Sequence, residues 1–538
     1  MRAEGRGEHD SLYFDYPSFP PPRDRSRLAD PTPVIIAGAG PVGMCAALTL
    51  ARHGIASVLI DRKDTFNDGS RAICISRSSF YILEALGAAA PFLEKSLGWT
   101  TGRTFYRGRQ ILEFHMPDGA DEKFRPMYNL EQQYIEAFLH DAVQAEPLID
   151  IRWQTEVTDL SQTGDGVTLG LRDPNGDYRL PGQWLLAADG ARSTIRKLRG
   201  LRLKGENYEG RYVIADVQMD HDYPTIRRAL FDPACRPGGT VLVHRQPDNI
   251  WRIDYQLRDD EENDTATREA EIRRNVEALL DEVGHTGGYD LEWWSVYSAN
   301  TLALDDYRDG RIFFVGDSAH IVPIFGVRGL NNGLADAQNI GWKLAWVMQG
   351  RADPALLDSY TPERRGATLD VFANASKSTR FMTPPSHGWQ LMRDAALSLA
   401  LSQPFAGALA NPRQMAPYTY AESPVTTPDA DGFAAGPMPG AVCADPPLES
   451  GHLSDRFKGG FTILSFGKTA DFAPLTSPDI DWIALPGSGP VAEAFGATDG
   501  TVYLVRPDIH IAGRWRSATT RTLSAALARA LGRTGIAA

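Results

Sequence analysis

In three segments of the chain a short apolar run leads into a glycine. Two of these segments also contain an acidic residue next to the glycine. The three segments are Gly38 to Gly43, Asp189-Gly190 and Gly316-Asp317. The runs before them have the composition of buried strands. In an open parallel sheet, ligands bind outside the carboxyl ends of the strands, so these ends can converge on one extended ligand. Glycines admit phosphates and carboxylates accept hydrogen bonds from hydroxyl groups, which favours a dinucleotide.

The first segment reads G-x-G-x-x-G and opens a helix. Gly38 allows the tight turn, Gly40 lets a pyrophosphate approach the backbone, and Gly43 lets helix and strand pack closely. The helix N-terminus then faces the phosphates with unpaired N–H groups. We therefore predict a dinucleotide-binding loop, and further contacts from Pro41, Val42 and, after the next strand, Arg62.

The elements around this loop complete the pattern. Strands are predicted at Val34 to Ile36 and Ala56 to Ile60, and the second ends at Asp61, whose carboxylate would accept hydrogen bonds from a ribose. If the loop holds the pyrophosphate of FAD, Asp317 is placed to accept hydrogen bonds from the ribityl hydroxyls. A helix that begins near Leu330 would direct its positive end toward the flavin ring.

Periodicity predicts an α/β fold with a Rossmann-like dinucleotide-binding unit and an inserted β-sheet unit. The expected strands are Arg152 to Leu160, Gly166 to Leu171, Trp184 to Ala188, Tyr212 to Gln218, Thr240 to His244, Ile250 to Leu257, Arg311 to Val315, Phe461 to Phe466, Ile480 to Leu485 and Thr501 to Arg506. The expected helices are Ser78 to Leu86, Glu131 to Ala145, Glu269 to Val283, one beginning near Leu330, and Leu523 to Leu531.

These elements suggest a division into units. We expect an N-terminal arm (1–30), a discontinuous FAD-binding domain (31–200 and 300–375), an inserted substrate-binding domain (201–299), a helical region (376–417), a linker rich in Pro, Ala, Gly and Asp (418–448) and a C-terminal α/β domain (449–538). The aromatic residues of the arm either pack on the first domain or belong to a disordered leader, and the sequence does not separate these alternatives.

Composition narrows the class of protein. The formal net charge is -13, which argues against a general nucleic-acid or anionic-membrane surface. The four cysteines are scattered, so no metal site or dithiol redox centre is expected, and their use fits a reducing compartment. No signal peptide and no apolar run of membrane-spanning length is recognised. We expect a soluble, cytoplasmic protein, and the linker and C-terminal domain hint at a homodimer.

The longer motifs carry a resemblance to a known family. They are GAGPVG at Gly38 to Gly43 with Asp61, SRAI at Ser70 to Ile73, the pattern Gln132-x-x-x-Glu136-x-x-Leu139, ADGARSTIR at Ala188 to Arg196, and GDSAHIVPIFGVRGLNNGLADAQNIGWKLA at Gly316 to Ala345. With them, residues from about 34 to 365 resemble the class A FAD-dependent aromatic hydroxylases typified by p-hydroxybenzoate hydroxylase. Within that family the chain is most similar to the phenol hydroxylase and 3-(3-hydroxyphenyl)propionate hydroxylase branch.

This resemblance implies roles for particular residues. Arg71 and Gln132 look like FAD contacts and Asp317 like the ribityl anchor, while Asp189 and Arg192 resemble a segment associated with both FAD and NAD(P)H. The part of the family's structure that forms a wall beside the flavin ring resembles this chain at Pro323, Gly326, Gly329, Leu330 and Asn331. The family usually has a second proline where this chain has Ile324. The C-terminal domain resembles the thioredoxin-like domain of the phenol hydroxylase branch but lacks C-x-x-C, so we expect a structural or oligomerisation role for it.

The resemblance also implies a reaction, in which NAD(P)H reduces FAD and a flavin C4a-hydroperoxide formed with O2 hydroxylates an electron-rich ring. Deprotonating a phenol would raise its reactivity, so the substrate domain should contain a polar relay. His244, Arg252 and Asp254 have the parity to share one face of the hairpin Thr240 to Leu257, and Tyr212 is a further candidate. That face either roofs the flavin or is the solvated side of a half-buried sheet.

The expected activity is thus the FAD- and NAD(P)H-dependent hydroxylation of a phenolic or similar aromatic compound. One alternative is a tailoring monooxygenase that epoxidises a polycyclic natural product or inserts oxygen into it in a Baeyer–Villiger reaction. A second is an NAD-dependent dehydrogenase, for which Gly38 to Asp61 alone would suffice, and a third is a non-catalytic flavin-binding or scaffold protein. A flavin halogenase is disfavoured because W-x-W-x-I-P is absent.

Overall fold

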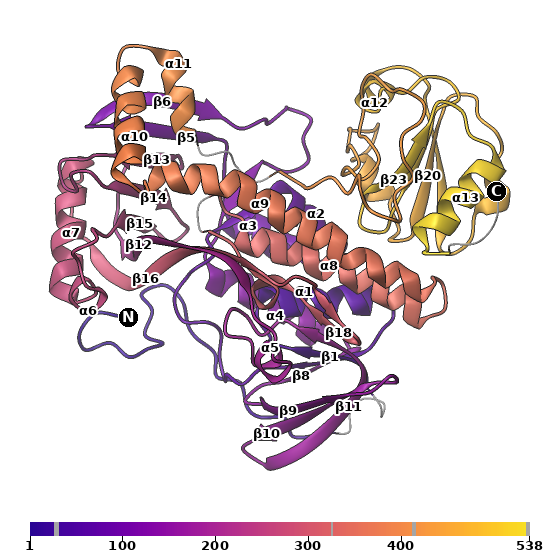
Figure 1. Cartoon of the computed structure of the whole chain (residues 1–538), viewed down its shortest axis with the longest axis horizontal. Helices are drawn as coiled ribbons and strands as arrows, with labels where there is room; N and C mark the ends of the chain where they lie inside the picture. The colour runs from indigo at the N-terminus through magenta and orange to yellow at the C-terminus, as the bar shows by residue number, and fades with distance from the viewer. Residues whose placement is uncertain (26–31, 324–325, 412–415, 534–538) are drawn as a thin grey trace.

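The computed structural model describes residues 1–25, 32–323, 326–411 and 416–533 (Figure 1). This part of the chain forms a mixed α/β structure that contains four β-sheets. None of its described helices is both long and apolar enough to cross a membrane.

The first sheet contains the strands that were predicted around the glycine loop. Its order is β17 (Arg308–Asp309), β18 (Ile312–Phe314), β11 (Gly176–Ala187), β1 (Thr32–Ala37), β2 (Ser57–Ile60) and β8 (Ile149–Arg152). From β18 to β8 all neighbouring strands are parallel. The antiparallel strands β10 (Val167–Asp173) and β9 (Glu156–Gln162) extend the sheet from β11.

The prediction of one strand from Arg152 to Leu160 is wrong, because the chain leaves the parallel sheet after β8 and enters the antiparallel extension with β9. Gln154 lies between them with a φ of 53°. Its N–H donates to the carbonyl oxygen of Lys63 at 2.8 Å, and the N–H of Thr155 donates to that of Asp61 at 2.8 Å. The loop after β2 therefore holds this corner in place.

Helices surround the parallel strands. The helix after the glycine loop is α1 (Pro41–Arg52), and it packs against α8 (Gly329–Met348) and α4 (Gln132–Ala145). Apolar residues of α1 such as Met44 and Leu50 are fully buried, as its periodicity predicts. The other described α-helices before the C-terminal unit are α2 (Arg77–Ala85), α3 (Ala89–Lys95), α5 (Thr194–Leu198), α6 (Asn263–Ala266), α7 (Glu269–Glu282), α9 (Tyr360–Met382), α10 (His387–Ala400) and α11 (Pro404–Gly407).

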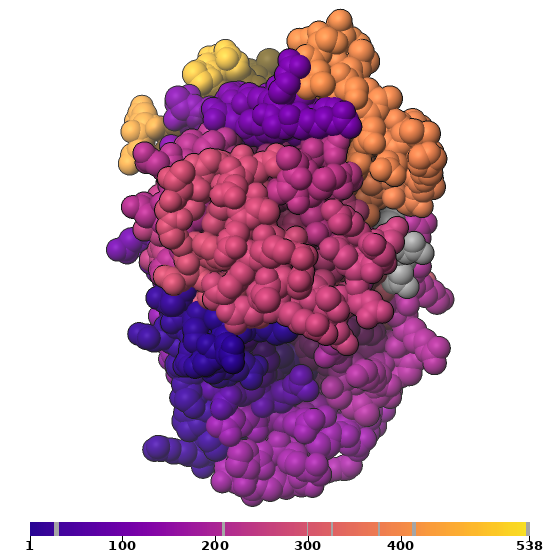
Figure 2. All heavy atoms as spheres, turned by 90° about the vertical axis from the view of Figure 1, so that its left-hand side faces the viewer, coloured from indigo at the N-terminus to yellow at the C-terminus, as the bar shows by residue number. Residues whose placement is uncertain are grey.

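The second sheet has the order β19 (His320–Ile321), β16 (Asp290–Ala303), β12 (Lys204–Gln218), β15 (Ile250–Gln256), β14 (Thr240–Arg245), β13 (Arg227–Phe231), β5 (Thr101–Tyr106) and β6 (Arg109–His115). One of its faces is apolar: Val213, Trp251 and Ile253 pack there with Ile272 and Val276 of α7. Figure 2 shows the segment that contains α6 and α7 covering the outer side of this sheet. The opposite face, which is polar, must therefore point into the molecule.

The N-terminal arm packs on the structure, which decides between the two alternatives for residues 1–25. Arg2 and Arg6 both pair with the buried carboxylate of Glu292 on β16, and Arg2 also pairs with Asp68 at 2.7 Å. Phe14 contacts Tyr134 edge-on. The arm thus joins the second sheet to the loop before Ser70. The third sheet, β3 (Cys74–Ser76), β7 (Met127–Asn129) and β4 (Leu97–Trp99), follows that loop.

The C-terminal unit contains the fourth sheet, in the order β21 (Ile480–Leu485), β20 (Phe461–Phe466), β22 (Val502–Val505) and β23 (Ile511–Trp515), with helices α12 (Pro490–Ala494) and α13 (Thr520–Ala530). It lies beside the ends of α8 and α9 (Figure 1). Phe461 contacts the rings of Trp342 and Trp346 edge-on. These two tryptophans therefore join α8 to the C-terminal unit by packing.

Buried charges also join this unit to α8 and α9. Arg506, just after β22, bonds both Glu363 at 2.6 Å and Asp508 at 2.6 Å, and Lys343 bonds Glu363 at 2.6 Å. All four side chains are at most 2% exposed. The two cations lower the pKa of Glu363 although burial opposes this, and burial lowers the pKa of Lys343 to about 8.

Replacing Glu363 with glutamine should loosen the C-terminal unit, because it leaves Arg506 and Lys343 buried with Asp508 as the remaining carboxylate of the cluster. Breaking a buried pair in this way costs about 3–5 kcal/mol. Urea unfolding would measure the loss. The matched control is Asp481→Asn, which removes an ion pair with the exposed Lys458 in the same unit and should have little effect. Equal stability of E363Q and the wild type would contradict this account.

Candidate functional site

The three predicted glycine and acid segments lie at one edge of the first sheet. Parallel pairing aligns Ala37 of β1 with Ala187 of β11, and Ala187 with Phe314 of β18. The segments that begin at Gly38, Asp189 and Gly316 follow these aligned ends by one or two residues. The predicted convergence of the three segments at one edge of the sheet is therefore confirmed.

The glycine loop is tightly packed at two of its glycines and open at the third. Gly38 has a φ of 104°, and a Cβ there would lie 2.4 Å from the carbonyl oxygen of Ala188. A Cβ on Gly43 would lie 1.9 Å from the carbonyl oxygen of Gly38. A Cβ on Gly40, in contrast, would meet no atom within 4 Å. Gly40 caps α1 without a side-chain hydrogen bond, so the N–H groups of the first turn border this open space.

Asp61 follows the end of β2 and lies against the glycine loop. Its carboxylate accepts hydrogen bonds from the backbone N–H of Ala39 at 2.8 Å and of Lys63 at 3.0 Å. These bonds hold the glycine loop against the end of β2. A carboxylate has further lone pairs that can accept bonds from hydroxyl groups. Arg62 is exposed beside it.

Gln132 organises the loop that contains Arg71. Its side-chain oxygen accepts hydrogen bonds from the N–H of Arg71 at 3.3 Å and of Ala72 at 3.2 Å. Its amide nitrogen donates to Glu136 at 2.7 Å, and Glu136 in turn accepts two bonds from Asn67. The side chain of Arg71 is exposed. The motif that links residues 132 and 136 thus shapes the loop, and leaves the guanidinium of Arg71 available to a ligand.

Asp317 is exposed, yet the surrounding protein raises the pKa of its carboxyl. We infer that it faces a recess rather than open solvent. Arg71 lies close enough to oppose that shift. The preceding Gly316 donates its N–H to Asp336 at 3.0 Å, and His320 bonds the same carboxylate at 2.7 Å. His320 is fully buried, so this hydrogen bond holds the segment after Asp317 against α8.

Asp189 and Arg192 differ in their surroundings. One carboxylate oxygen of Asp189 accepts a hydrogen bond from the N–H of Ile195 at 3.0 Å, in the first turn of α5. Its other oxygen is buried with no partner among the described residues, and burial raises the pKa of this carboxyl. Arg192 is exposed.

Asn331 ties the start of α8 to neighbouring segments. Its side-chain oxygen accepts bonds from the N–H of Ser76 at 2.8 Å and the hydroxyl of Ser79 at 2.7 Å. Its amide nitrogen donates to the carbonyl oxygens of Val327 and Cys74. Of the other residues predicted for the flavin wall, Pro323 is buried and Gly326, Gly329 and Leu330 are half-buried, whereas Ile324 lies outside the described residues.

The polar face of the second sheet is buried, so the alternative of a solvated face is wrong. His244, Arg252 and Asp254 are 7%, 1% and 6% exposed. Strand register pairs Arg252 with both His244 and Asp216. The guanidinium of Arg252 donates to both oxygens of Asp216, at 2.8 and 2.7 Å, and to the carbonyl oxygen of Ser70. This face therefore contacts the residue next to Arg71.

Several polar atoms on this face have no partner among the described residues. They are Nδ1 of His244, Oδ1 of Asp254 and both amide atoms of Gln246. Buried polar groups in proteins are nearly always hydrogen-bonded, so such a group of atoms marks a place for a ligand or water. Burial raises the pKa of Asp254 to about 7, although Arg252 and Arg227 oppose this. Burial and the same two arginines lower the pKa of His244 well below its usual value. Near neutral pH this histidine is neutral.

Tyr212 lies on the same strand as Asp216, but its hydroxyl bonds Thr383 at 2.7 Å, just beyond α9. Sequence reasoning missed two members of the polar face, Asp216 and Arg227. Asp216 falls in a predicted strand with the parity to face Arg252. The available signal for Arg227 was the run Arg227 to Phe231, in which two adjacent arginines point to opposite faces of one strand.

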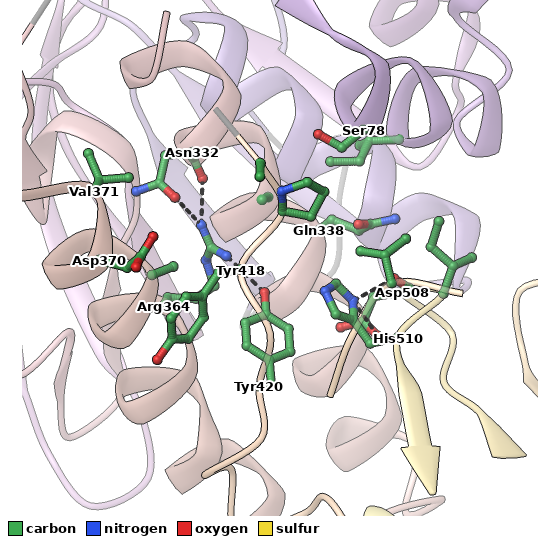
Figure 3. A pocket seen from close by; sticks show the side chains of 17 residues that line it. Ser78, Asn332, Gln338, Arg364, Asp370, Val371, Tyr418, Tyr420, Asp508 and His510 are labelled. Atoms are coloured by element: carbon green, nitrogen blue, oxygen red, sulfur yellow. Dashed lines mark hydrogen bonds and ion pairs between the residues drawn. The ribbon is translucent and has the colours of Figure 1, made fainter. Parts of the chain in front are cut away.

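A separate hollow lies between α2, α8, α9 and the C-terminal unit (Figure 3). Arg364 points across it and bonds Tyr420 at 2.8 Å and Asp336 at 2.6 Å. The ring of Tyr420 stacks on His510, with centroids 4.3 Å apart. This hollow is not lined by the glycine loop or by His244. Within the described part of the chain, no group of His, Cys, Asp and Glu side chains could hold a metal ion.

Comparisons with known proteins agree with this geometry. The family described as FAD binding domain matches residues 31–375. The 3-(3-hydroxy-phenyl)propionate/3-hydroxycinnamic acid hydroxylase of Mycobacterium sp. (strain JLS) is 29% identical over 363 residues, 68% of this chain and 62% of the relative. The chain thus spans less than two thirds of that relative's length.

Two other proteins match over almost the whole chain. The 6-methylpretetramide 4-monooxygenase of Streptomyces rimosus is 29% identical over 536 residues, 93% of each protein. The crystal structure of the flavin-dependent monooxygenase PieE in complex with FAD and substrate has a TM-score of 0.79 at 23% identity, and the alignment covers 93% of this chain and 99% of that one. The second similarity shows a shared fold.

Proposed function

The chain belongs to the family of FAD-binding domains, and from this premise we propose that it is a flavin-dependent monooxygenase that uses NAD(P)H and O2 to hydroxylate a phenolic or other electron-rich aromatic compound. The observation that carries the proposal is the buried polar face with its unpartnered His244 and Asp254, which contacts the loop before Arg71. The activity of relatives named hydroxylases and monooxygenases supports it.

We assign FAD to the edge where the three strand ends meet, because the open space at Gly40 and the recessed Asp317 fit a pyrophosphate and a polyol. The proposed FAD contacts are Gly38, Gly40, Pro41, Val42, Gly43, Asp61, Arg62, Arg71, Gln132, Asp189, Arg192, Asp317, Pro323, Gly326, Gly329, Leu330 and Asn331. Bound FAD would supply the redox chemistry that activates O2 with electrons from NAD(P)H.

The chain's own residues would prepare the aromatic substrate. We propose that the unpartnered Oδ1 of Asp254 accepts the proton of a substrate hydroxyl, because a carboxyl with a pKa of about 7 can take up a proton near neutral pH. Arg252, which Asp216 holds in place, favours the resulting negative charge. Neutral His244 can donate or accept a hydrogen bond at the ring. Tyr212 has less support, since its hydroxyl already bonds Thr383.

The finer architecture is also a proposal. We assign FAD binding to residues 31–200 and 300–375, substrate binding to 201–299 with β5 and β6 added to its sheet, and a thioredoxin-like fold to residues 449–538. The mixed four-stranded sheet of the C-terminal unit, with β20 and β21 parallel and β22 and β23 antiparallel, supports the last assignment. Residues 418–448 would be its linker, and the unit could serve in a homodimer.

A second candidate is a tailoring monooxygenase that oxygenates a polycyclic natural product. The observation that favours it is the match over 93% of the chain to 6-methylpretetramide 4-monooxygenase. An NAD-dependent dehydrogenase is disfavoured, because the third strand end, Gly316-Asp317, joins the same ligand edge.

The absorption spectrum of the purified protein and its oxidation of NAD(P)H test the two proposed monooxygenase activities. We expect a flavin spectrum, and NAD(P)H oxidation that accelerates when one member of a panel of phenols, hydroxyaromatic acids and polycyclic phenols is added. Mass spectrometry should show that compound gaining one oxygen atom. The compound that responds would choose between the two monooxygenase candidates. A protein that cannot be reconstituted with FAD would refute both.

A further inference from the structure

Arg227 is a buried arginine without an internal partner. It lies at the start of β13 and is 7% exposed. Its backbone pairs with β5, but its guanidinium has no hydrogen bond or ion pair with any residue in the described ranges. Burial lowers the pKa of Arg227 to about 10, so the side chain remains charged at neutral pH. A buried guanidinium with no anion is costly, and proteins rarely retain one without a reason.

The contrast with Arg252 shows what Arg227 lacks. The guanidinium of Arg252 donates a hydrogen bond to each of the two carboxylate oxygens of Asp216. Arg227 lies near Asp254 and Cys74, whose charges act on its pKa, but neither forms a bond with it. Burial raises the pKa of the Cys74 thiol to about 12, so at neutral pH this thiol is uncharged.

The two arginines of this face differ in how their charge is met. Arg252 interacts electrostatically with Asp216, Asp254 and Glu131, and it also has two hydrogen bonds to Asp216. Arg227 interacts with Asp254, Cys74 and His244, of which the thiol and the imidazole are neutral near pH 7. Burial raises the pKa of Asp254 to about 7, so this carboxyl does not fully neutralise Arg227 near neutral pH.

The position of Arg227 on the polar face places its guanidinium beside the other candidate residues. One step beyond the printed register of β13 and β14, Arg227 lies opposite His244, whose pKa it lowers. Its other neighbour, Cys74, is bonded through its backbone oxygen to Asn331 at the start of α8. Arg227 thus interacts electrostatically with the proposed base, Asp254, and with Cys74, which contacts the segment assigned to the flavin wall.

We propose that Arg227 binds an anionic oxygen of the aromatic substrate, so that the enzyme acts on aromatic acids or on phenols that bind as phenolates. The inference rests on the proposed function for the identity of this ligand as the substrate. A planar guanidinium recognises a carboxylate in a bidentate manner and a phenolate through a single charge-assisted bond. Both sources share one chemistry, and probes can separate them.

The test compares binding of matched probes to the flavin-loaded protein, read as a change in the flavin spectrum without NAD(P)H. The probes are 3-(3-hydroxyphenyl)propionate, its methyl ester, and a nitrophenol titrated across its own ionisation. Carboxylate recognition predicts that the acid binds more tightly than the ester. Phenolate recognition predicts that the nitrophenol binds more tightly as it ionises.

Arg227→Met should weaken the preferred anionic probe about 10- to 100-fold, the size expected for one hydrogen bond between charged groups. The ester should change by no more than a few-fold, and Arg227→Lys should lie between. Arg228→Met is the matched control: its guanidinium bonds His221 and lies over the ring of Tyr223, on the opposite face of the strand. It should keep the wild-type ratio of acid to ester binding.

Flavin content and thermal unfolding of each variant would exclude a folding defect. Wild-type affinity for the anionic probes in a flavin-loaded R227M would overturn the proposal, as would a wild type that prefers neither anion over its neutral form. If Arg227 proves to hold the anion but no compound accelerates NAD(P)H oxidation, the anion site stands and the proposed monooxygenase activity fails.

Discussion

Replacing Gly40 with valine should abolish FAD binding while leaving the apoprotein folded. Gly40 has an extended backbone, with a φ of −75° that any residue adopts, and a Cβ there meets no protein atom within 4 Å. The new side chain would instead occupy the space in front of the N-terminus of α1, which we assign to the pyrophosphate. Losing two or more charge-assisted bonds to N–H groups weakens binding by about 100-fold or more. Flavin fluorescence titration of the apoprotein would measure this.

Gly43→Ala is the informative comparison, since a Cβ there would lie 1.9 Å from the carbonyl oxygen of Gly38. This variant should lower the stability of the apoprotein itself, by about 2 kcal/mol. G40V should unfold at the wild-type temperature. If G40V instead binds FAD with wild-type affinity, the phosphates do not lie at this loop.

The predictable part of the fold is the part with strong local signals. Strands β1 and β2, the helix between them and Asp61 follow from an apolar run, glycines and a helical period within 28 residues. The break between β8 and β9 could not be predicted in this way. It depends on hydrogen bonds from Gln154 and Thr155 to the loop after β2, about 90 residues earlier in the chain. Strand β16 was missed because its tryptophans and polar residues do not alternate regularly.

The candidate site also has a part that the sequence predicts and a part that it does not. Convergence of the three strand ends follows from the rule for parallel sheets, so Gly38, Asp189 and Asp317 could be placed at one edge of the sheet from the sequence. The face shared by His244, Arg252 and Asp254 followed from parity along one hairpin. Whether that face is buried depends on which side α7 covers, and no local pattern states this. Arg227 lies on a strand that pairs with β5, a segment more than 100 residues away in the sequence. Its neighbours could not be predicted, because they depend on the register of these strands.

Asp254→Asn should lower kcat/KM for the responding phenol by about 100- to 10,000-fold, the range for loss of a positioned general base. Because the pKa of Asp254 is raised from its usual value to about 7, its carboxylate form appears as pH rises through 7. The wild-type rate should therefore rise with pH to a plateau above 7, whereas D254N should lose this step.

Stability offers an independent readout of the same group. A carboxyl whose pKa is raised in the folded state binds its proton more tightly than the unfolded chain does, so its contribution to stability is present at low pH and is lost as pH rises through 7. D254N cannot ionise, and its stability should fall less than that of the wild type between pH 5 and 8. Asp248→Asn is the matched control: it removes a carboxylate from the turn of the same hairpin, at a φ of 58° that asparagine adopts readily. D248N should keep the wild-type pH profile of the rate. A D254N enzyme with that same profile would show that another group accepts the substrate proton.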